Sequence, residues 1–249
     1  MADEEDPVVP VPEDAEMRVT AVFSYNSGLS TIQDGYGEEF DEVLSSVTGH
    51  VAKEVFTKET KEARLSGKLL ASPGVMNHLV LVETLRDEMG WDIDHAAGRN
   101  KKDIRTAGYE PRSFSDEECA LDIQPGDAHA GKRSIDALKN QLGVEVQYGK
   151  YAFLMYDVLA KFAHMSRAGR VSAGVEIVPS RSLHSHMSSG VGNFDQLRAE
   201  LEHLPEDYIN KLYQIPLVAI GIGFEEDPVD LDNLEDEVQH FSQSKMDAY

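Results

Sequence analysis

The chain of 249 residues has a single cysteine, Cys119, a single tryptophan and only 12 lysines. One cysteine excludes an internal disulfide and a zinc site built from several cysteines, and we expect a reduced thiol in a cytoplasmic protein. Since no run of about 18 consecutive apolar residues occurs, the sequence predicts no membrane span. The acidic N-terminus, Met1-Ala2-Asp3-Glu4-Glu5-Asp6, is unlike the basic start of a secretory signal.

Basic residues are scarce overall, and the formal net charge is −22. The acids are unevenly placed, because residues 1–16 carry seven acids and no base, and residues 224–249 carry nine acids and one base. The 207 residues between them carry a net charge of −7. Within these, residues 128–181 hold eight bases and four acids. A local basic segment in an acidic chain predicts contact with phosphates.

Two explanations account for the acidic remainder of the chain. It is either a generic solvated surface with acidic tails or an adaptation to a very salty cytoplasm, where carboxylates keep the surface hydrated and salt screens their repulsion. The scarcity of lysine and the abundance of aspartate favour the second, a halophilic source. Phosphate contacts weaken steeply with salt, so a nucleic-acid enzyme in such a cell must rely more on shape and base contacts.

The apolar periodicity predicts an α/β (α+β) fold with a central mixed β-sheet flanked by helices. Residues 1–16 are expected to form a disordered acidic lead, 17–223 a single domain with its core at about 128–223, and 224–249 an acidic tail. Loops are expected at 26–37, at 180–192 and over most of 92–130. Strands are expected at 18–25, 172–179 and 215–222, a hairpin at 135–148, and helices at 38–58, 72–91, 151–167, 193–204 and 206–213.

The hairpin carries the residues of greatest chemical interest. Val144 and Val146 alternate with Glu145 and Gln147, which is typical of a half-buried strand with its polar residues on one face. A turn near Lys139-Asn140-Gln141 would fold Asp136 back beside Glu145. Two hard oxygen donors a few ångströms apart suit a magnesium ion. The spacing alone is equally compatible with an exposed hairpin that carries ordinary polar residues.

Asp136, followed nine positions later by Glu145-Val146-Gln147, resembles the PD-(D/E)xK nuclease motif in a variant with Gln in place of the usual Lys. The frame Ile135-Asp136 and Val144-Glu145-Val146-Gln147-Tyr148-Gly149-Lys150-Tyr151-Ala152-Phe153 resembles the BglII/BstYI group of type II restriction endonucleases. The resemblance covers most of residues 17–222 and is strongest at 132–223. It implies a restriction-endonuclease-like core and a Mg²⁺-dependent enzyme that cuts a short palindrome in double-stranded DNA as a homodimer.

The chemistry of the residues assigns roles within this resemblance. Asp136, Glu145 and the main-chain carbonyl of Val146 are expected to hold Mg²⁺. The carboxamide of Gln147 does not titrate in water, so it orients water or phosphate and leaves water activation to the metal. The segment Ser189-Gly190-Val191-Gly192-Asn193 lacks the spacing of a phosphate-binding loop, and no nucleotide cofactor is expected.

A further set of residues is predicted to contact DNA. The resemblance implies base contacts at Gly149 and Lys150 and places Ser188 and Ser189 near the bases, although a polar surface loop is the alternative for the latter. The complete set is Lys132, Arg133, Gly149, Lys150, Arg181, Ser182, His184, His186, Ser188 and Ser189. Two other functions stay open: a PD-(D/E)xK nuclease of repair or junction cutting, and a non-catalytic DNA-binding protein.

Overall fold

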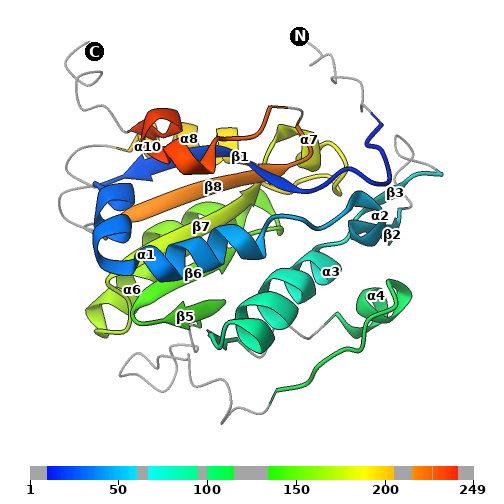
Figure 1. Ribbon diagram of the computed structural model, residues 1–249, viewed down its shortest axis with the longest axis horizontal. Helices are drawn as coiled ribbons and strands as arrows, with labels where there is room; N and C mark the ends of the chain where they lie inside the picture. Colours follow the sequence, from blue (N-terminus) through cyan, green and yellow to red (C-terminus); the bar gives the residue numbers. More distant parts are fainter. Residues whose placement is uncertain are drawn as a thin grey trace.

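A computed structural model describes residues 10–60, 67–94, 100–114, 134–204, 215–225 and 227–240. Its centre is a seven-stranded sheet in the order β4-β5-β6-β7-β8-β1-β9 (Figure 1). The strands of this sheet are β1 Arg18–Tyr25, β4 Asp92–Ile93, β5 Ala137–Lys139, β6 Leu142–Val146, β7 Ala173–Pro179, β8 Leu217–Gly223 and β9 Gln239–His240.

The sheet is mixed, as predicted. Strands β6, β7 and β8 are parallel neighbours, whereas β5 pairs antiparallel with β6 and β1 pairs antiparallel with β8. Every residue of β7 and β8 is buried, which confirms the central strand expected at 215–222. Helices cover both faces of these strands, so their side chains are buried. This explains why their sequences are nearly continuous apolar runs.

Helices cover both faces of the sheet (Figure 1). Helix α1 and the helix that starts with α3 pack with one face, while α5, α6 and α8 pack with the other. Two long helices contain π-helical segments, His78–Glu88 after α3 and Asp157–Lys161 between α5 and α6. The helices are α1 Gly28–Ser46, α2 Ala52–Val55, α3 Pro73–Asn77, α4 Lys101–Thr106, α5 Tyr151–Tyr156, α6 Phe162–Arg167, α7 Arg181–His184 and α8 Phe194–Glu202.

Most predicted elements of the second half are confirmed, including the helices at 151–167 and 193–204. Helix α8 begins where expected, because the Asn193 side chain accepts a hydrogen bond from the N–H of Gln196 and caps it. The predicted loop at 180–192 contains the short helix α7. The helix predicted at 206–213 lies outside the described residues.

The helix predicted at 38–58 is confirmed only over 38–46 and 52–55, and the loop predicted at 26–37 is wrong from Gly28 onward. Helix α1 begins ten residues earlier, at Gly28, and bends at Tyr36. Its first turns bury Leu29 and Ile32, so the apolar stripe begins upstream of the predicted helix start. Phe56 does not extend the helix, because β2 (Phe56–Glu59) forms a two-stranded sheet with β3 (Leu69–Ala71).

Part of the predicted acidic tail joins the fold. A 3-10 turn at Leu231–Asn233 and helix α10 (Leu234–Glu237) lead into β9, which pairs in parallel with β1. Leu234 and Val238 are buried among acidic neighbours. Two apolar residues among many carboxylates are too weak a periodic signal to reveal this from the sequence.

The predicted hairpin is formed by β5 and β6. Its turn residues Asn140 and Gln141 have φ angles of 47° and 70°, as a two-residue turn with left-handed residues requires. Upstream of it, β4 and α4 lie in the stretch that the sequence left without structure. No helix of the described residues is long and apolar enough to cross a membrane.

Candidate active site

The hairpin brings Asp136 and Glu145 together. Asp136 immediately precedes β5, and the pairing of Ala137 with Val144 places it opposite Glu145. Its Oδ2 accepts a hydrogen bond of 2.9 Å from the N–H of Val146. The carboxylate is therefore fixed against the strand that carries Glu145, while the side chain stays partly accessible.

Strand β6 is buried on both faces, so the half-buried strand predicted from the alternation is wrong. Glu145 is only 1% exposed because the helix of residues 151–167 covers its face of the sheet. This helix approaches closely at Gly174 of β7, where a Cβ atom would lie 2.7 Å from Cε1 of Phe162. The polar face expected to meet solvent instead lies under a helix.

That helix contributes two charged residues to the site, Asp157 and Lys161. Lys161 Nζ lies 2.7 Å from Glu145 Oε2 and 2.9 Å from Asp157 Oδ1. Neither residue is predicted from the sequence as a member of the site. The available signal was an acid and a base four positions apart within a strongly apolar helix, a spacing that places them on one side.

Gln147 follows Glu145 on the same face and is held at both ends. Its Nε2 donates to Asp157 Oδ2, and its Oε1 accepts a hydrogen bond of 2.8 Å from the N–H of Gly149. These contacts fix which way the amide points. The predicted orienting residue therefore has a defined orientation and a bonded link to the covering helix.

Two more buried acids border the site. Glu176 on β7 lies beside Glu145 in the parallel register, is 0% exposed, and has no hydrogen-bond partner for either carboxylate oxygen among the described residues. The N–H of Asp94, a buried residue after β4, donates to the backbone carbonyl of Asp136. Glu176 was detectable as a lone charge within an otherwise apolar strand.

Burial governs the protonation of these acids. It raises the pKa of Glu145 and of Glu176 well above the usual range, and neighbouring carboxylates raise the pKa of both further. Burial also raises the pKa of Asp136, against the opposing effects of the Lys161 ammonium and the Val146 N–H. A site that gathers carboxylates with raised pKa values favours any added cation, which would stabilise their charged forms.

The acids alone do not form a complete metal site. Among the described ranges, no group of three or more His, Cys, Asp or Glu side chains is arranged to hold a metal ion. Oxygens remain for one nonetheless, since Glu145 Oε1 is buried without a partner among the described residues, and Oδ2 is the only oxygen of Asp136 that accepts a hydrogen bond in a described contact. A cation bound here would need further ligands from the backbone, water or a substrate.

Two of the predicted DNA-contacting segments lie side by side. The N–H of Gly192 donates to the carbonyl of Gly149, and that of Tyr151 donates to the carbonyl of Gly190. Lys150 forms an isolated bridge with Val191. Gly149, Lys150 and Ser189 are exposed, so the two segments present one joint surface next to Gln147.

Other residues of the second segment point into the protein. Ser182 Oγ accepts a hydrogen bond from the N–H of Phe224, and His184 Nε2 lies 3.0 Å from the carbonyl oxygen of Val191. His186 is 9% exposed, with its ring 5.1 Å from that of Phe56. Ser188 Oγ accepts a hydrogen bond from Lys58 Nζ. Arg181 differs from these residues, because its side chain is exposed. Lys132 and Arg133 lie outside the described residues.

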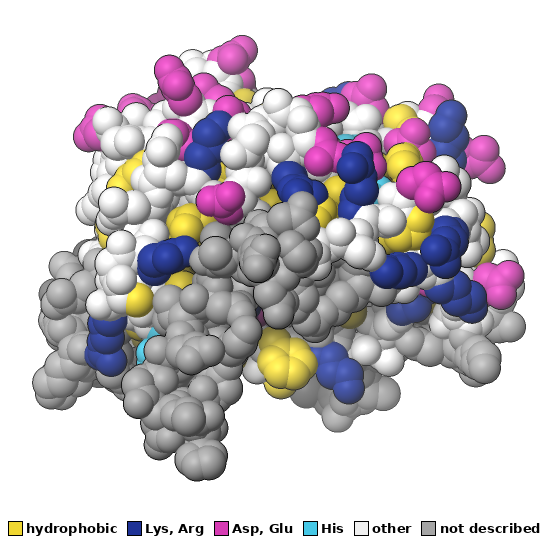
Figure 2. All heavy atoms as spheres, turned by 90° about the horizontal axis from the view of Figure 1, so that it is seen from below, with side chains coloured by type: hydrophobic (Ala, Val, Ile, Leu, Met, Phe, Trp, Pro, Cys, Tyr) yellow, Lys and Arg dark blue, Asp and Glu magenta, His cyan; other side chains and the backbone are white. Residues whose placement is uncertain are grey.

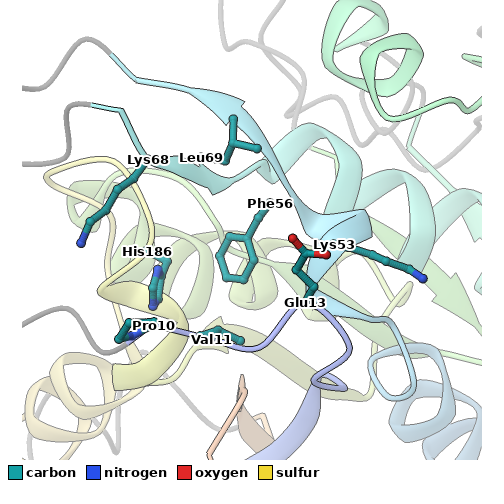
Figure 3. A pocket seen from close by; sticks show the side chains of 8 residues that line it. All are labelled: Pro10, Val11, Glu13, Lys53, Phe56, Lys68, Leu69 and His186. Atoms are coloured by element: carbon teal, nitrogen blue, oxygen red, sulfur yellow. The ribbon is translucent and has the colours of Figure 1, made fainter.

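A cavity of about 430 Å³ lies apart from the carboxylates, between the N-terminal segment and the sheet of β2 and β3 (Figure 3). Phe56 and His186 contribute rings to it, and Lys53, Lys68 and Glu13 lie around them. None of the clustered acids lines it. The chemistry of the site therefore rests on the hairpin and its covering helix.

A family model for restriction endonuclease BglII/BglIII matches residues 20–222 of the sequence. The chain belongs to this family. It is a type II site-specific deoxyribonuclease, and the hairpin lies inside the matched range. A comparison with curated protein sequences finds no significant match.

The fold of this BglII/BglIII-family endonuclease is similar to a solved structure, the crystal structure of restriction endonuclease BglII complexed with a DNA 16-mer. The TM-score is 0.51 at 15% sequence identity, over 83% of this chain and 76% of the other. At this identity the likeness shows the restriction-endonuclease fold. It confirms the mixed sheet flanked by helices that the sequence predicted.

Proposed function

We propose that this endonuclease hydrolyses phosphodiester bonds at a short palindromic sequence in double-stranded DNA, with Mg²⁺ held by Asp136, Glu145 and the carbonyl of Val146. One observation carries the proposal: the hairpin sets Asp136 opposite Glu145, with Asp136 Oδ2 fixed on the N–H of Val146. Glu145 Oε1 is buried without a hydrogen-bond partner among the described residues, which supports a cation ligand at this place. Hard oxygen donors of this kind are the usual choice for Mg²⁺.

When bound, the magnesium ion would polarise the scissile phosphate and stabilise the developing charge on its oxygens. Asp136 would offer Oδ1, because its Oδ2 is occupied by the Val146 N–H. Gln147 orients the attacking water or a phosphate oxygen by hydrogen bonding. Its amide neither gives nor takes a proton, so its contribution is geometric.

The DNA surface in this proposal combines the Gly149–Lys150 segment with the neighbouring loop at 188–192. Lys150 and Ser189 are exposed there, and Arg181 is exposed at the start of helix α7, which precedes the loop. Ser182, His184 and His186 support the loop from within. On the side shown in Figure 2, Lys and Arg side chains lie among uncharged ones, and many acidic side chains gather toward the upper margin.

A homodimer fits the proposal, because a two-fold palindrome is matched most simply by a two-fold protein. Light scattering of the protein with and without a DNA duplex measures this directly. A dimer mass in at least the DNA-bound state is expected. A single protomer on each cleavable duplex would contradict the palindromic part of the proposal.

The central experiment incubates phage DNA with the protein and Mg²⁺, with EDTA as the metal-free arm. Discrete fragments that require Mg²⁺ are expected, and sequencing their ends gives the cleaved sequence. Glu145→Ala should abolish cleavage and leave DNA binding in Ca²⁺ largely intact, whereas Glu38→Ala, at an exposed carboxylate on α1, should cut as the wild type does. A smear or junction-only cutting would favour a repair nuclease, and unchanged cleavage by Glu145→Ala would refute the site.

A further inference from the structure

Lys161 links the proposed metal ligand Glu145 to Asp157, which in turn bonds the amide of Gln147. Its ammonium bonds Glu145 Oε2 at 2.7 Å and Asp157 Oδ1 at 2.9 Å. Asp157 Oδ2 in turn accepts from Nε2 of Gln147. A continuous chain of bonded side chains therefore runs from a proposed metal ligand to the proposed orienting amide.

The position of this ammonium is unusual for a surface lysine. The Lys161 side chain is 16% exposed. It extends from the helix of residues 151–167 toward the strands β6 and β7, which this helix covers. Four carboxylates act on one another in this space, those of Asp136, Glu145, Asp157 and Glu176. Lys161 is the cation that opposes their mutual repulsion in the described part of the chain. A buried charge of this kind persists only when it is paired.

We propose that Lys161 is a positioning residue of the active site, which holds Glu145 by Oε2 and, through Asp157, sets the amide of Gln147. The inference rests on the proposed function and deepens it. Because the ammonium already donates to Oε2, the oxygen that Glu145 would offer to a metal ion is Oε1, which has no hydrogen-bond partner among the described residues. Lys161 also holds the orientation of the Gln147 amide, because Asp157 bonds Lys161 through Oδ1 and Gln147 through Oδ2.

Two opposite effects follow from removing the ammonium. A positive charge bonded to a metal ligand repels an incoming divalent cation, so its loss should tighten metal binding. Its loss also frees Asp157 and Gln147 from a fixed geometry, so the reaction should slow. A residue with a purely structural role would weaken both metal binding and turnover. The signs of the two changes therefore distinguish positioning from general damage.

The test compares Lys161→Met and Lys161→Arg with the wild type and with Lys53→Met, the same substitution at an exposed lysine of α2. Calorimetry with Ca²⁺ and the DNA-free protein measures cation affinity. Lys161→Met should bind Ca²⁺ about tenfold more tightly. In single-turnover cleavage at saturating Mg²⁺ it should be about 100-fold slower. Lys161→Arg should recover much of the rate, and Lys53→Met should match the wild type in both assays.

Weaker Ca²⁺ binding together with slow cleavage, or cleavage at the wild-type rate, would overturn the inference. If Lys161→Met does not fold, the double variant Lys161→Met/Glu176→Met removes one buried carboxylate with the ammonium and enters the same assays. The proposed function is judged separately by Glu145→Ala. An inactive Glu145→Ala beside a fully active Lys161→Met refutes only the role of Lys161, whereas an active Glu145→Ala refutes the site itself.

Discussion

Glu176 offers a direct test of the electrostatics beneath the site, through the substitution Glu176→Met. Both carboxylate oxygens of Glu176 are buried without a hydrogen-bond partner among the described residues. Methionine has a similar length and no charge, and the surrounding strand β7 is apolar. The substitution should therefore stabilise the metal-free protein, because it removes a buried polar group that folding leaves unsatisfied.

The size of the effect depends on pH, with a sign set by the raised pKa of Glu176. Burial lifts this pKa well above its usual value of 4.5, so the folded protein retains a proton that the unfolded chain releases. The stability from this group is complete below about pH 4.5 and is lost as the pH rises toward the folded pKa. Over the pH range in which the folded protein retains one proton that the unfolded chain releases, the free energy of unfolding falls by about 1.4 kcal/mol per pH unit.

Urea unfolding in EDTA, at fixed KCl and at several pH values, measures this prediction. The free energy of unfolding of the wild type should fall from pH 5 to pH 7 more steeply than that of Glu176→Met. Glu38→Gln, at an exposed carboxylate, should keep the wild-type slope. Identical slopes for the wild type and Glu176→Met would show that Glu176 is ionised when folded, and would refute the reasoning.

Three further predictions concern packing, DNA and salt. Gly174→Ala should lower the free energy of unfolding by about 1–3 kcal/mol, because the added Cβ meets the ring of Phe162, and Phe162→Leu should restore part of it in a urea titration. Lys150→Ala should weaken DNA binding in Ca²⁺ and reduce the slope of log affinity against log salt by about one if the lysine meets a phosphate, whereas an unchanged slope would place it elsewhere. Cleavage should persist in molar KCl, and circular dichroism should show the fold loosening at low salt; structure lost on adding salt would contradict a halophilic surface.

The carboxylate pair of the hairpin was predictable because its residues lie close together in the sequence. Asp136 and Glu145 lie nine positions apart, and the turn between them follows from chain chemistry that a single sequence displays. The same holds for the helix at 151–167 and the buried strand β8, whose apolar patterns are long and strong. Helix α1 begins ten residues before its predicted start, and its added first turns bury Leu29 and Ile32 against the sheet.

The sequence by itself determined the hairpin, the pair of carboxylates and the amide beside them, because these depend on alternation and short spacing. Only the tertiary structure decided that a helix covers the face of β6 that carries Glu145, and that Glu176 lies beside Glu145. It also decided that Lys161, from this helix, forms an ion pair with Glu145. These contacts join strands and a helix whose relative positions cannot be predicted from the local sequence pattern of any one of them. Their physical origin is packing, which brings a distant lysine into a cluster of carboxylates that would otherwise repel one another.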